Sequence, residues 1–158
     1  MKGLRKEEWD ENTLTFIYDK NNVSVIITVH KDILYLEEFT AQYDNNIPRA
    51  RKGLAYEMLC RLVHKLIKYN YIDENKNIEL NAVTLIKFKT EKEENASQKK
   101  LIEYYMSKGF KPVAENDYRK GIKMYQPIKS FLKMCGELTK KQIRGSYRYH
   151  NYPSTNER

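Results

Sequence analysis

The feature that most constrains this chain is a helical repeat of apolar residues between two β-rich segments. From Gly53 onward, apolar side chains recur at spacings of three and four, which predicts an amphipathic helix. These positions are Leu54, Met58, Leu59, Leu62, Val63, Leu66 and Ile67. Residues 32–42 before the helix and 77–88 after it are rich in strand-forming side chains. A strand, a helix and a second strand in this order form the unit that joins two parallel strands.

Further β-rich segments precede this unit. Residues 14–20 and 23–31 flank an Asn-Asn turn signal, which predicts a hairpin. In the third strand, 32–42, the alternation of apolar residues breaks at the adjacent acids Glu37 and Glu38. We expect a β-bulge there, because a bulge accommodates such a break.

The second half of the chain predicts a short helix and a late hairpin. Residues 98–108 form the helix, with Asn95 or Ser97 as its N-cap and Gly109 just beyond its C-terminus. Residues 110–128 contain two strand-like runs around a polar turn. After them we expect a final helix interrupted by a glycine, and then a tail.

The predicted order is three strands, a helix, a strand, a helix and two strands. This order predicts an α+β fold with a mixed, mostly antiparallel sheet around one central parallel pair. The length of 158 residues suits one core. We assign residues 1–127 to one domain and residues 128–158 to a C-terminal helix with a basic, aromatic-rich tail.

Composition limits the classes of partner. The formal charge of +8 favours anionic partners such as nucleic acid, phosphorylated cofactors or acidic proteins. Much of the excess lies in the late segment KKQIRGSYRYHNY, so the tail could account for it alone. No segment has the roughly 20 consecutive apolar residues of a membrane span, and the opening residues resemble no signal peptide. We therefore expect an intracellular, cytoplasmic protein that does not enter membranes.

The cysteines and histidines indicate neither a disulfide framework nor a metal site. Cys60 and Cys135 form no CxxC pair, which favours a reducing compartment, and Cys60 is expected to be a small core residue. His30, His64 and His150 lack ligand spacing. We expect no bound metal.

A basic, glycine-containing segment opens the long helix. Arg49, Arg51 and Lys52 precede Gly53, which lets a ligand approach the backbone closely. The free amides of a first helical turn and the helix dipole attract an anion, whereas basic side chains at this end are unfavourable without one. The alternative is that these are solvated loop residues and that the glycine only permits a turn.

A second segment, ENASQKKLIEYYMSKGFKPV, follows the later strand. Together with RKGLAYEML it resembles GCN5-related N-acetyltransferases, in which a Q/R-x-x-G-x-G/A motif is followed by a tyrosine-containing helix and a Gly-Phe strand. The likeness covers roughly residues 13 to 127. The chain departs from the pattern at Ala50, Ala55 and Gln98, and the N-terminal helices usual in the family are expected to be shortened or lost.

The resemblance implies acetyl-coenzyme A as the cofactor, with its pyrophosphate on the amides that open the long helix. The pantetheine arm would lie where strands 32–42 and 77–88 splay apart. The implied cofactor-binding residues are Phe39, Thr40, Arg49, Arg51, Lys52, Gly53, Leu54, Ala55, Gln98 and Tyr105.

The resemblance also implies the catalytic groups. Tyr105, four residues before the glycine of the Gly-Phe pair, matches the tyrosine that protonates the departing thiolate. The alternative is that Tyr104 or Tyr105 simply faces the core. Glu38 is the expected base for the amine, and only one of Glu37 and Glu38 faces the cleft unless a bulge re-aims them.

Two function classes follow. The first is an N-acetyltransferase that moves an acetyl group from acetyl-coenzyme A to a primary amine of a small molecule or protein by direct attack. The second is an inactive binding module of the same fold for nucleic acid or an acidic protein, since RGSYRYHNY interleaves aromatic and basic residues. Either class is compatible with a monomer or a homodimer.

Overall fold

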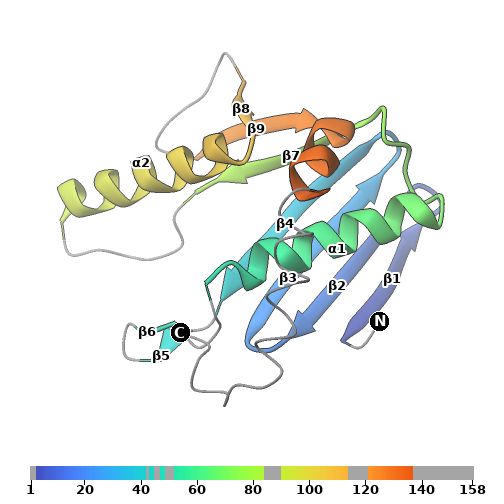
Figure 1. The fold of residues 1–158 in the computed structure, drawn as a ribbon, viewed down its shortest axis with the longest axis horizontal. Coiled ribbons are helices and arrows are strands. Elements are labelled where there is room, and N and C mark those ends of the chain that lie inside the picture. The colour runs from blue at the N-terminus through green and yellow to red at the C-terminus, as the bar shows by residue number, and fades with distance from the viewer. Residues whose placement is uncertain are drawn as a thin grey trace.

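A seven-stranded mixed sheet organises the protein, in the order β1-β2-β3-β4-β7-β9-β8 (Figure 1). This computed structural model describes residues 3–41, 43–44, 47–48, 52–83, 90–113 and 121–136. The strands of the sheet are β1 (Leu4–Asp10), β2 (Thr13–Lys20), β3 (Val23–His30), β4 (Ile33–Ala41), β7 (Asn77–Ala82), β8 (Lys111–Pro112) and β9 (Ile122–Pro127). A separate small pair consists of β5 (Tyr43–Asp44) and β6 (Ile47–Pro48). The parallel neighbours in the sheet are β4 and β7, and the other pairs are antiparallel. The expected α+β class with a mostly antiparallel sheet is confirmed.

The early hairpin and the bulge are confirmed. Strands β2 and β3 pair from Thr13 opposite His30 to Lys20 opposite Val23, and both turn asparagines have positive φ, as a tight hairpin requires. In β4, Ile27 lies opposite Leu36 whereas Ile26 lies opposite Glu38. Glu37 is therefore the extra residue of a bulge.

Strand β1 was not expected. Its sequence, LRKEEWD, is charged and has no apolar alternation, so sequence analysis began the sheet at residue 14 and was wrong there. The strand is the sheet's outer edge, and six of its seven residues are exposed. A strand with so little buried surface needs few apolar residues. Its charged side chains also discourage pairing with a further strand.

Two long helices and a third helical segment accompany the sheet. Helix α1 (Leu54–Lys68) follows the predicted apolar stripe, and nine of its residues are buried. Helix α2 (Glu91–Ser107) begins earlier than expected. Its N-cap is Thr90, whose hydroxyl accepts from the amide of Glu93 at 3.2 Å, so the expected caps Asn95 and Ser97 are wrong. Both lie within the helix, because the charged run before them is itself helical.

The end of α2 is as predicted. Gly109 has φ +94°, and its amide donates to the carbonyl of Met106, while the amide of Phe110 donates to the carbonyl of Tyr105. This pair of bonds is a Schellman motif. A Cβ at Gly109 would lie 2.8 Å from both Gln126 and Met134, so the position requires glycine for space as well as for conformation.

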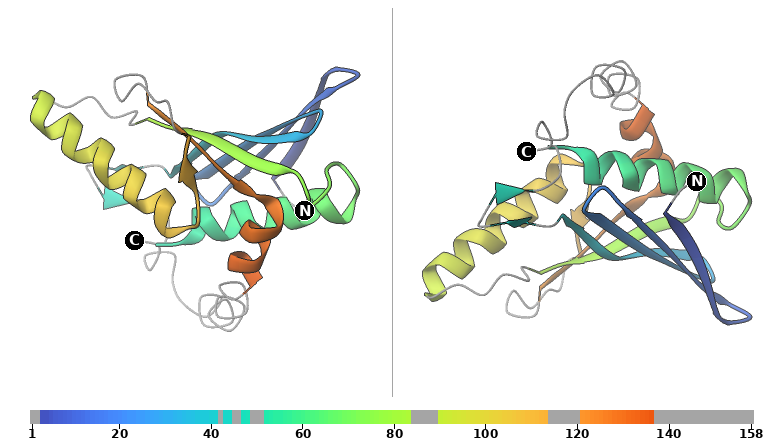
Figure 2. Two further views of the ribbon diagram at one scale, coloured as in Figure 1. Left: turned by 90° about the horizontal axis from the view of Figure 1, so that it is seen from above. Right: turned by 90° about the horizontal axis from the view of Figure 1, so that it is seen from below.

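The helices cover one face of the sheet and leave the other face of β1–β4 open (Figure 2). A chain of ring contacts joins α1 to the third helical segment (residues 128–136), from Tyr56 to Phe131 and from Phe131 to Phe110. Cys60 of α1 and Cys135 are joined by a disulfide, with a Cα–Cα distance of 5.6 Å. Cys60 is a buried core residue, as expected. Its pairing with Cys135 was not predicted, because the packing of two helices far apart in sequence creates the pair.

The described ranges contain no helix with the length and apolar character needed to cross a bilayer. The same ranges contain no group of three or more metal-ligating side chains placed to share an ion.

Candidate functional site

The two parallel strands separate part of the way along. Their last paired residues are Leu36 of β4 and Leu80 of β7. Beyond this point β4 still pairs with β3 as far as Ala41, and β7 still pairs with β9 as far as Ala82. In the part of the chain that the structure describes, no strand pairs with this edge of β4 after Leu36. The peptide groups along it are therefore placed to bind an extended ligand.

The N-terminus of α1 has no side-chain cap. Gly53 is the N-cap residue with φ +86°, and the first intrahelical bond runs from the amide of Glu57 to the carbonyl of Gly53 at 3.0 Å. The amides of Leu54, Ala55 and Tyr56 precede that bond and have no intrahelical partner. Gly53 and Lys52 are exposed, so this helix end is open to solvent.

The acid in the first turn does not oppose an anion there. Glu57 is only 3% exposed, and its carboxylate accepts from Arg61 at 2.8 Å. This ion pair offsets the charge of Glu57 within the core. The field at the opening of α1 is thus set by the helix dipole and by nearby cations.

Aromatic rings lie beside the point where β4 leaves β7. The ring of Phe39, three residues beyond Leu36, lies 6.4 Å from the ring of Tyr104 and 6.3 Å from that of Tyr105. The two tyrosine rings are 5.4 Å apart. Tyr105 is the tyrosine that faces the core, and it also contacts Phe110.

Desolvation raises the pKa of these phenols. It raises the pKa of Tyr105, with Tyr104 adding a smaller effect, and desolvation raises the pKa of Tyr104 to about 12. Burial, followed by the proximity of Tyr104, also raises the pKa of Tyr56 to about 12. Each of these hydroxyls is a proton donor at neutral pH.

Tyr56 and Lys108 complete this cluster. The side chain of Tyr56 is in the first turn of α1 and is 2% exposed, and its buried hydroxyl has no hydrogen-bond partner among the described residues. The ammonium of Lys108, at the end of α2, lies 4.5 Å from the centre of the Tyr56 ring and 5.5 Å from that of Tyr104. Buried hydroxyls without a partner are rare in native proteins, so the Tyr56 hydroxyl is available to an ordered water or to a polar ligand atom.

Gln98 has a structural contact. Its side-chain amide donates to the carbonyl of Ala82, the last residue of β7, at 2.5 Å. The interaction ties α2 to the end of the strand that borders the separation.

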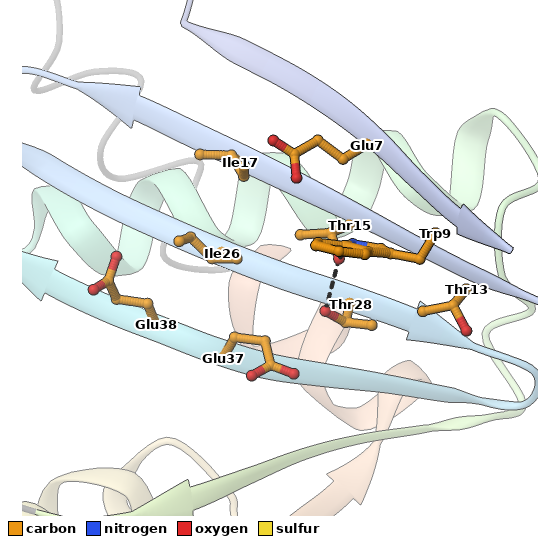
Figure 3. Close-up of a pocket in the computed structure, with 9 residues that line it drawn as sticks. All are labelled: Glu7, Trp9, Thr13, Thr15, Ile17, Ile26, Thr28, Glu37 and Glu38. Atoms are coloured by element: carbon orange, nitrogen blue, oxygen red, sulfur yellow. Dashed lines mark hydrogen bonds between the residues drawn. The ribbon is translucent and has the colours of Figure 1, made fainter.

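The open face of the sheet carries a groove of about 610 Å³, shown in Figure 3. Glu37 and Glu38 both line it, because the bulge turns two consecutive side chains to one face. Sequence analysis expected only one of the two to face the cleft unless a bulge re-aimed them, and the bulge is present. Phe39, opposite the buried Val25, faces the helices instead. Glu38 and Tyr105 thus lie on opposite sides of β4.

The sequence-predicted residues that the structure describes lie on three elements around the separation of β4 from β7, and Phe39 and Tyr105 contact each other whereas Glu38 faces the other side of the sheet. They fall into three groups: the opening of α1 (Lys52, Gly53, Leu54 and Ala55), the separating part of β4 (Glu38, Phe39 and Thr40), and α2 (Gln98 and Tyr105). Arg49 and Arg51 lie outside the described residues.

Sequence reasoning missed four residues of this region. Glu7 and Trp9 belong to the unexpected strand β1, so no pattern placed them on the groove. Tyr56 and Lys108 were missed because each was counted only as part of a predicted helix. A signal for Lys108 existed, since it is a cation at the C-cap directly before the Gly-Phe pair.

No family model matches the chain, and no curated protein sequence matches it. Among solved structures, the chain is similar to one described as the crystal structure of the anti-CRISPR protein AcrVA5. The TM-score is 0.48 and the sequence identity is 14%, over 71% of this chain and 97% of the other.

Proposed function

We propose that this protein is an N-acetyltransferase that transfers the acetyl group of acetyl-coenzyme A to a primary amine. The observation that carries the proposal is the separation of β4 from β7 after Leu36, beside a glycine-capped helix with free first-turn amides. A strand edge without a partner suits the pantetheine arm, and the helix end suits the diphosphate. The likeness of both sequence segments to GCN5-related N-acetyltransferases supports the same assignment.

In this proposal the cofactor binds across the opening of α1. The amides of Leu54, Ala55 and Tyr56 donate to the diphosphate, and Lys52 adds a positive charge. Lys108 supplies a second cation beside the first turn, through its position over the Tyr56 ring. The Tyr56 hydroxyl, which has no partner among the described residues, gains a hydrogen bond from the same ligand.

The chemistry divides between the two sides of β4. On the open face, Glu38 accepts the proton that the amine must lose before its nitrogen attacks the acetyl carbonyl. On the helix side, Tyr105 donates its proton to the departing thiolate, since a tyrosine phenol is protonated at neutral pH. Tyr104 is the alternative donor, since its ring lies against that of Tyr105.

Isothermal titration with acetyl-coenzyme A tests the cofactor site. We expect saturable binding that Gly53→Glu abolishes, because the new side chain places a negative charge at the diphosphate and is strained at φ +86°. Lys68→Glu, which also introduces a carboxylate but at the exposed other end of α1, is the control and retains binding. Absence of heat and of a thermal shift with the unaltered protein at millimolar cofactor would contradict the proposal.

Turnover tests the assignment of the acid. Tyr105→Phe keeps cofactor affinity and lowers the transfer rate by roughly a hundredfold, the usual contribution of a positioned general acid. Tyr104→Phe serves as the matched comparison in the same ring pair. If Tyr104→Phe lowers the rate and Tyr105→Phe does not, the donor is Tyr104.

A binding module for nucleic acid is the second candidate, and one surface favours it. Arg5, Lys6 and Lys65 surround the exposed rings of Tyr69 and Tyr71 in a groove of about 340 Å³ between β1 and α1. Cations beside exposed aromatic rings suit phosphates and stacked bases. The tail that suggested this function lies outside the described residues. Oligonucleotide binding that weakens with salt and with Lys65→Glu supports this candidate, and an unchanged affinity of that variant rejects the surface.

A further inference from the structure

The groove on the open face has an apolar and threonine-rich floor between acidic sides. Ile17, Ile26 and the pair Thr15 and Thr28 form the floor on β2 and β3 (Figure 3). Glu7 of β1 stands on one side, and Glu37 and Glu38 of β4 stand on the other. The two outer strands are three strand spacings apart, which is roughly 14 Å.

The three carboxylates have no ion-pair partner among the described residues, although the chain carries a formal charge of +8. Two cations of the same sheet pair with other acids. Arg5 pairs with Asp19 at 3.6 Å, and Lys123 pairs with Glu79 at 3.1 Å. In a cation-rich protein, acids that gather in a groove without a counter-charge leave a local negative potential.

Trp9 adds an aromatic surface to the same groove. Its indole lies over Thr15 and Thr28, and its ring N–H donates to the hydroxyl of Thr15 at 2.9 Å (Figure 3). The residue is 65% exposed, so one side of the ring faces solvent. An exposed indole face beside carboxylates attracts ammonium groups.

The polar groups of the floor are already paired with one another. The hydroxyl of Thr15 contacts that of Thr28 at 3.1 Å, and the hydroxyl of Thr13 contacts the ring of His30 at 2.7 Å. The floor therefore offers few free partners for the amides of a peptide backbone. It instead suits a ligand made of methylene groups and ammonium groups, which need apolar contact and negative charge.

We propose that this groove binds a linear polyamine, with its methylenes on Ile17, Ile26 and the indole, and its ammonium groups near the Glu7 and Glu37–Glu38 sides. A ligand with cations at both ends matches the two acidic sides, whereas a single lysine side chain engages only one. That the polyamine is also the acetyl acceptor rests on the function proposed above. In that case Glu38 lies next to the terminal nitrogen that is acetylated.

The test uses the whole protein with spermine and no coenzyme. Trp9 is the chain's only tryptophan, so binding changes its fluorescence without any substitution. We expect saturable binding of spermine, weaker binding of spermidine, and weakest binding of putrescine and of blocked lysine, which carry fewer cations. Isothermal titration, which does not depend on the indole, compares the variants: Trp9→Ala and Glu7→Gln each weaken spermine binding about fivefold to tenfold.

Glu103→Gln is the matched control, since it removes the same charge from an exposed position on α2 and leaves the affinity unchanged. Equal affinity for spermine and putrescine, or unaltered binding by the Trp9 and Glu7 variants, overturns the inference. So does tighter binding of a lysine peptide than of spermine. Circular dichroism and thermal melts confirm that each variant is folded.

The two proposals fail separately. Spermine binding without any acetyl-coenzyme A binding retains the groove and rejects the transferase. Acetyl-coenzyme A binding and acetyl transfer to another amine, with no spermine binding, retain the transferase and reject the polyamine.

Discussion

The two faces of the same sheet are built on different principles. On the helix side, Phe16, Val25, Ile27, Leu34 and Leu36 are all nearly or fully inaccessible, and the packing also includes a disulfide and a chain of aromatic rings. On the open side, the same strands present threonines, isoleucines and acids to a groove. Because successive strand residues point to opposite faces, one stretch of sequence encodes both the packed face and the face that carries the groove. The difference teaches that a substitution should be judged by face before it is judged by residue type.

The largest expected effect is on the free energy of unfolding, and it comes from the disulfide on the helix side of the sheet. Cys60 and Cys135 are 75 residues apart, and a crosslink over a loop of this length stabilises a chain by about 4 kcal/mol in the loop-entropy description. Urea denaturation with and without a reducing agent measures the loss. The variant with both cysteines replaced by alanine is insensitive to the reductant. Equal stability of the unaltered protein under both conditions would show that the bond contributes nothing.

The next effect compares two adjacent residues of β3. Ile27 faces the helices and is 0% exposed, so Ile27→Ala leaves a cavity and costs about 3 kcal/mol. Ile26 lies on the open face and is half-buried, so Ile26→Ala costs about 1 kcal/mol. Denaturation of the two variants in parallel gives both values. Equal losses would remove the distinction between the faces, and only Ile26→Ala is expected to weaken spermine binding.

The smallest effect concerns alkaline pH. A tyrosine phenol in an unfolded chain has a pKa near 10, and burial raises the pKa of Tyr56 to about 12. Above pH 10 the unfolded state therefore loses this proton first and is favoured. The contribution is fully present below pH 10 and is lost as the pH rises to about 12, and about 1 kcal/mol of it is lost by pH 11.

Urea denaturation at about pH 8 and about pH 11 measures this dependence. Tyr56→Phe reduces it, because a phenylalanine ring does not titrate. At neutral pH the substitution costs little, since the hydroxyl that it removes has no partner among the described residues. Tyr69→Phe, at a position that is 57% exposed, is the control. The same pH dependence in both variants would contradict a special role for Tyr56.

Much of the fold was predictable because local patterns agreed with the tertiary arrangement. Short local patterns were enough to predict three features: the apolar stripe of α1, the Asn-Asn turn and the closing glycine of α2. Strand β1 was not predictable, since an edge strand buries little and its pattern of charges contains no period. The start of α2 was misplaced for a related reason, because Thr90 caps a first turn made only of charged residues.

For the candidate site, the sequence could identify individual residues but could not predict which of them lie close together. The glycine at the start of α1 and the tyrosines of α2 could be identified as residues, but their proximity to Phe39 depends on how β4 leaves β7. Likewise, the groove needs Glu7 from one strand and Glu37 from another that is three places away. The Cys60–Cys135 pair follows the same rule, since helix packing sets it and the spacing of the cysteines does not.

The bulge at Glu37 allows the charge of the open face to change while the pairing of β3 with β4 stays the same. Ile27 and Ile26 are opposite Leu36 and Glu38, so removing Glu37 would leave every other pair of β3 and β4 aligned as before. Phe39 would keep its orientation, and the open face would lose one negative charge. Deletion of this one residue, in evolution or by design, therefore lowers the negative charge of the groove without a change in the interior packing.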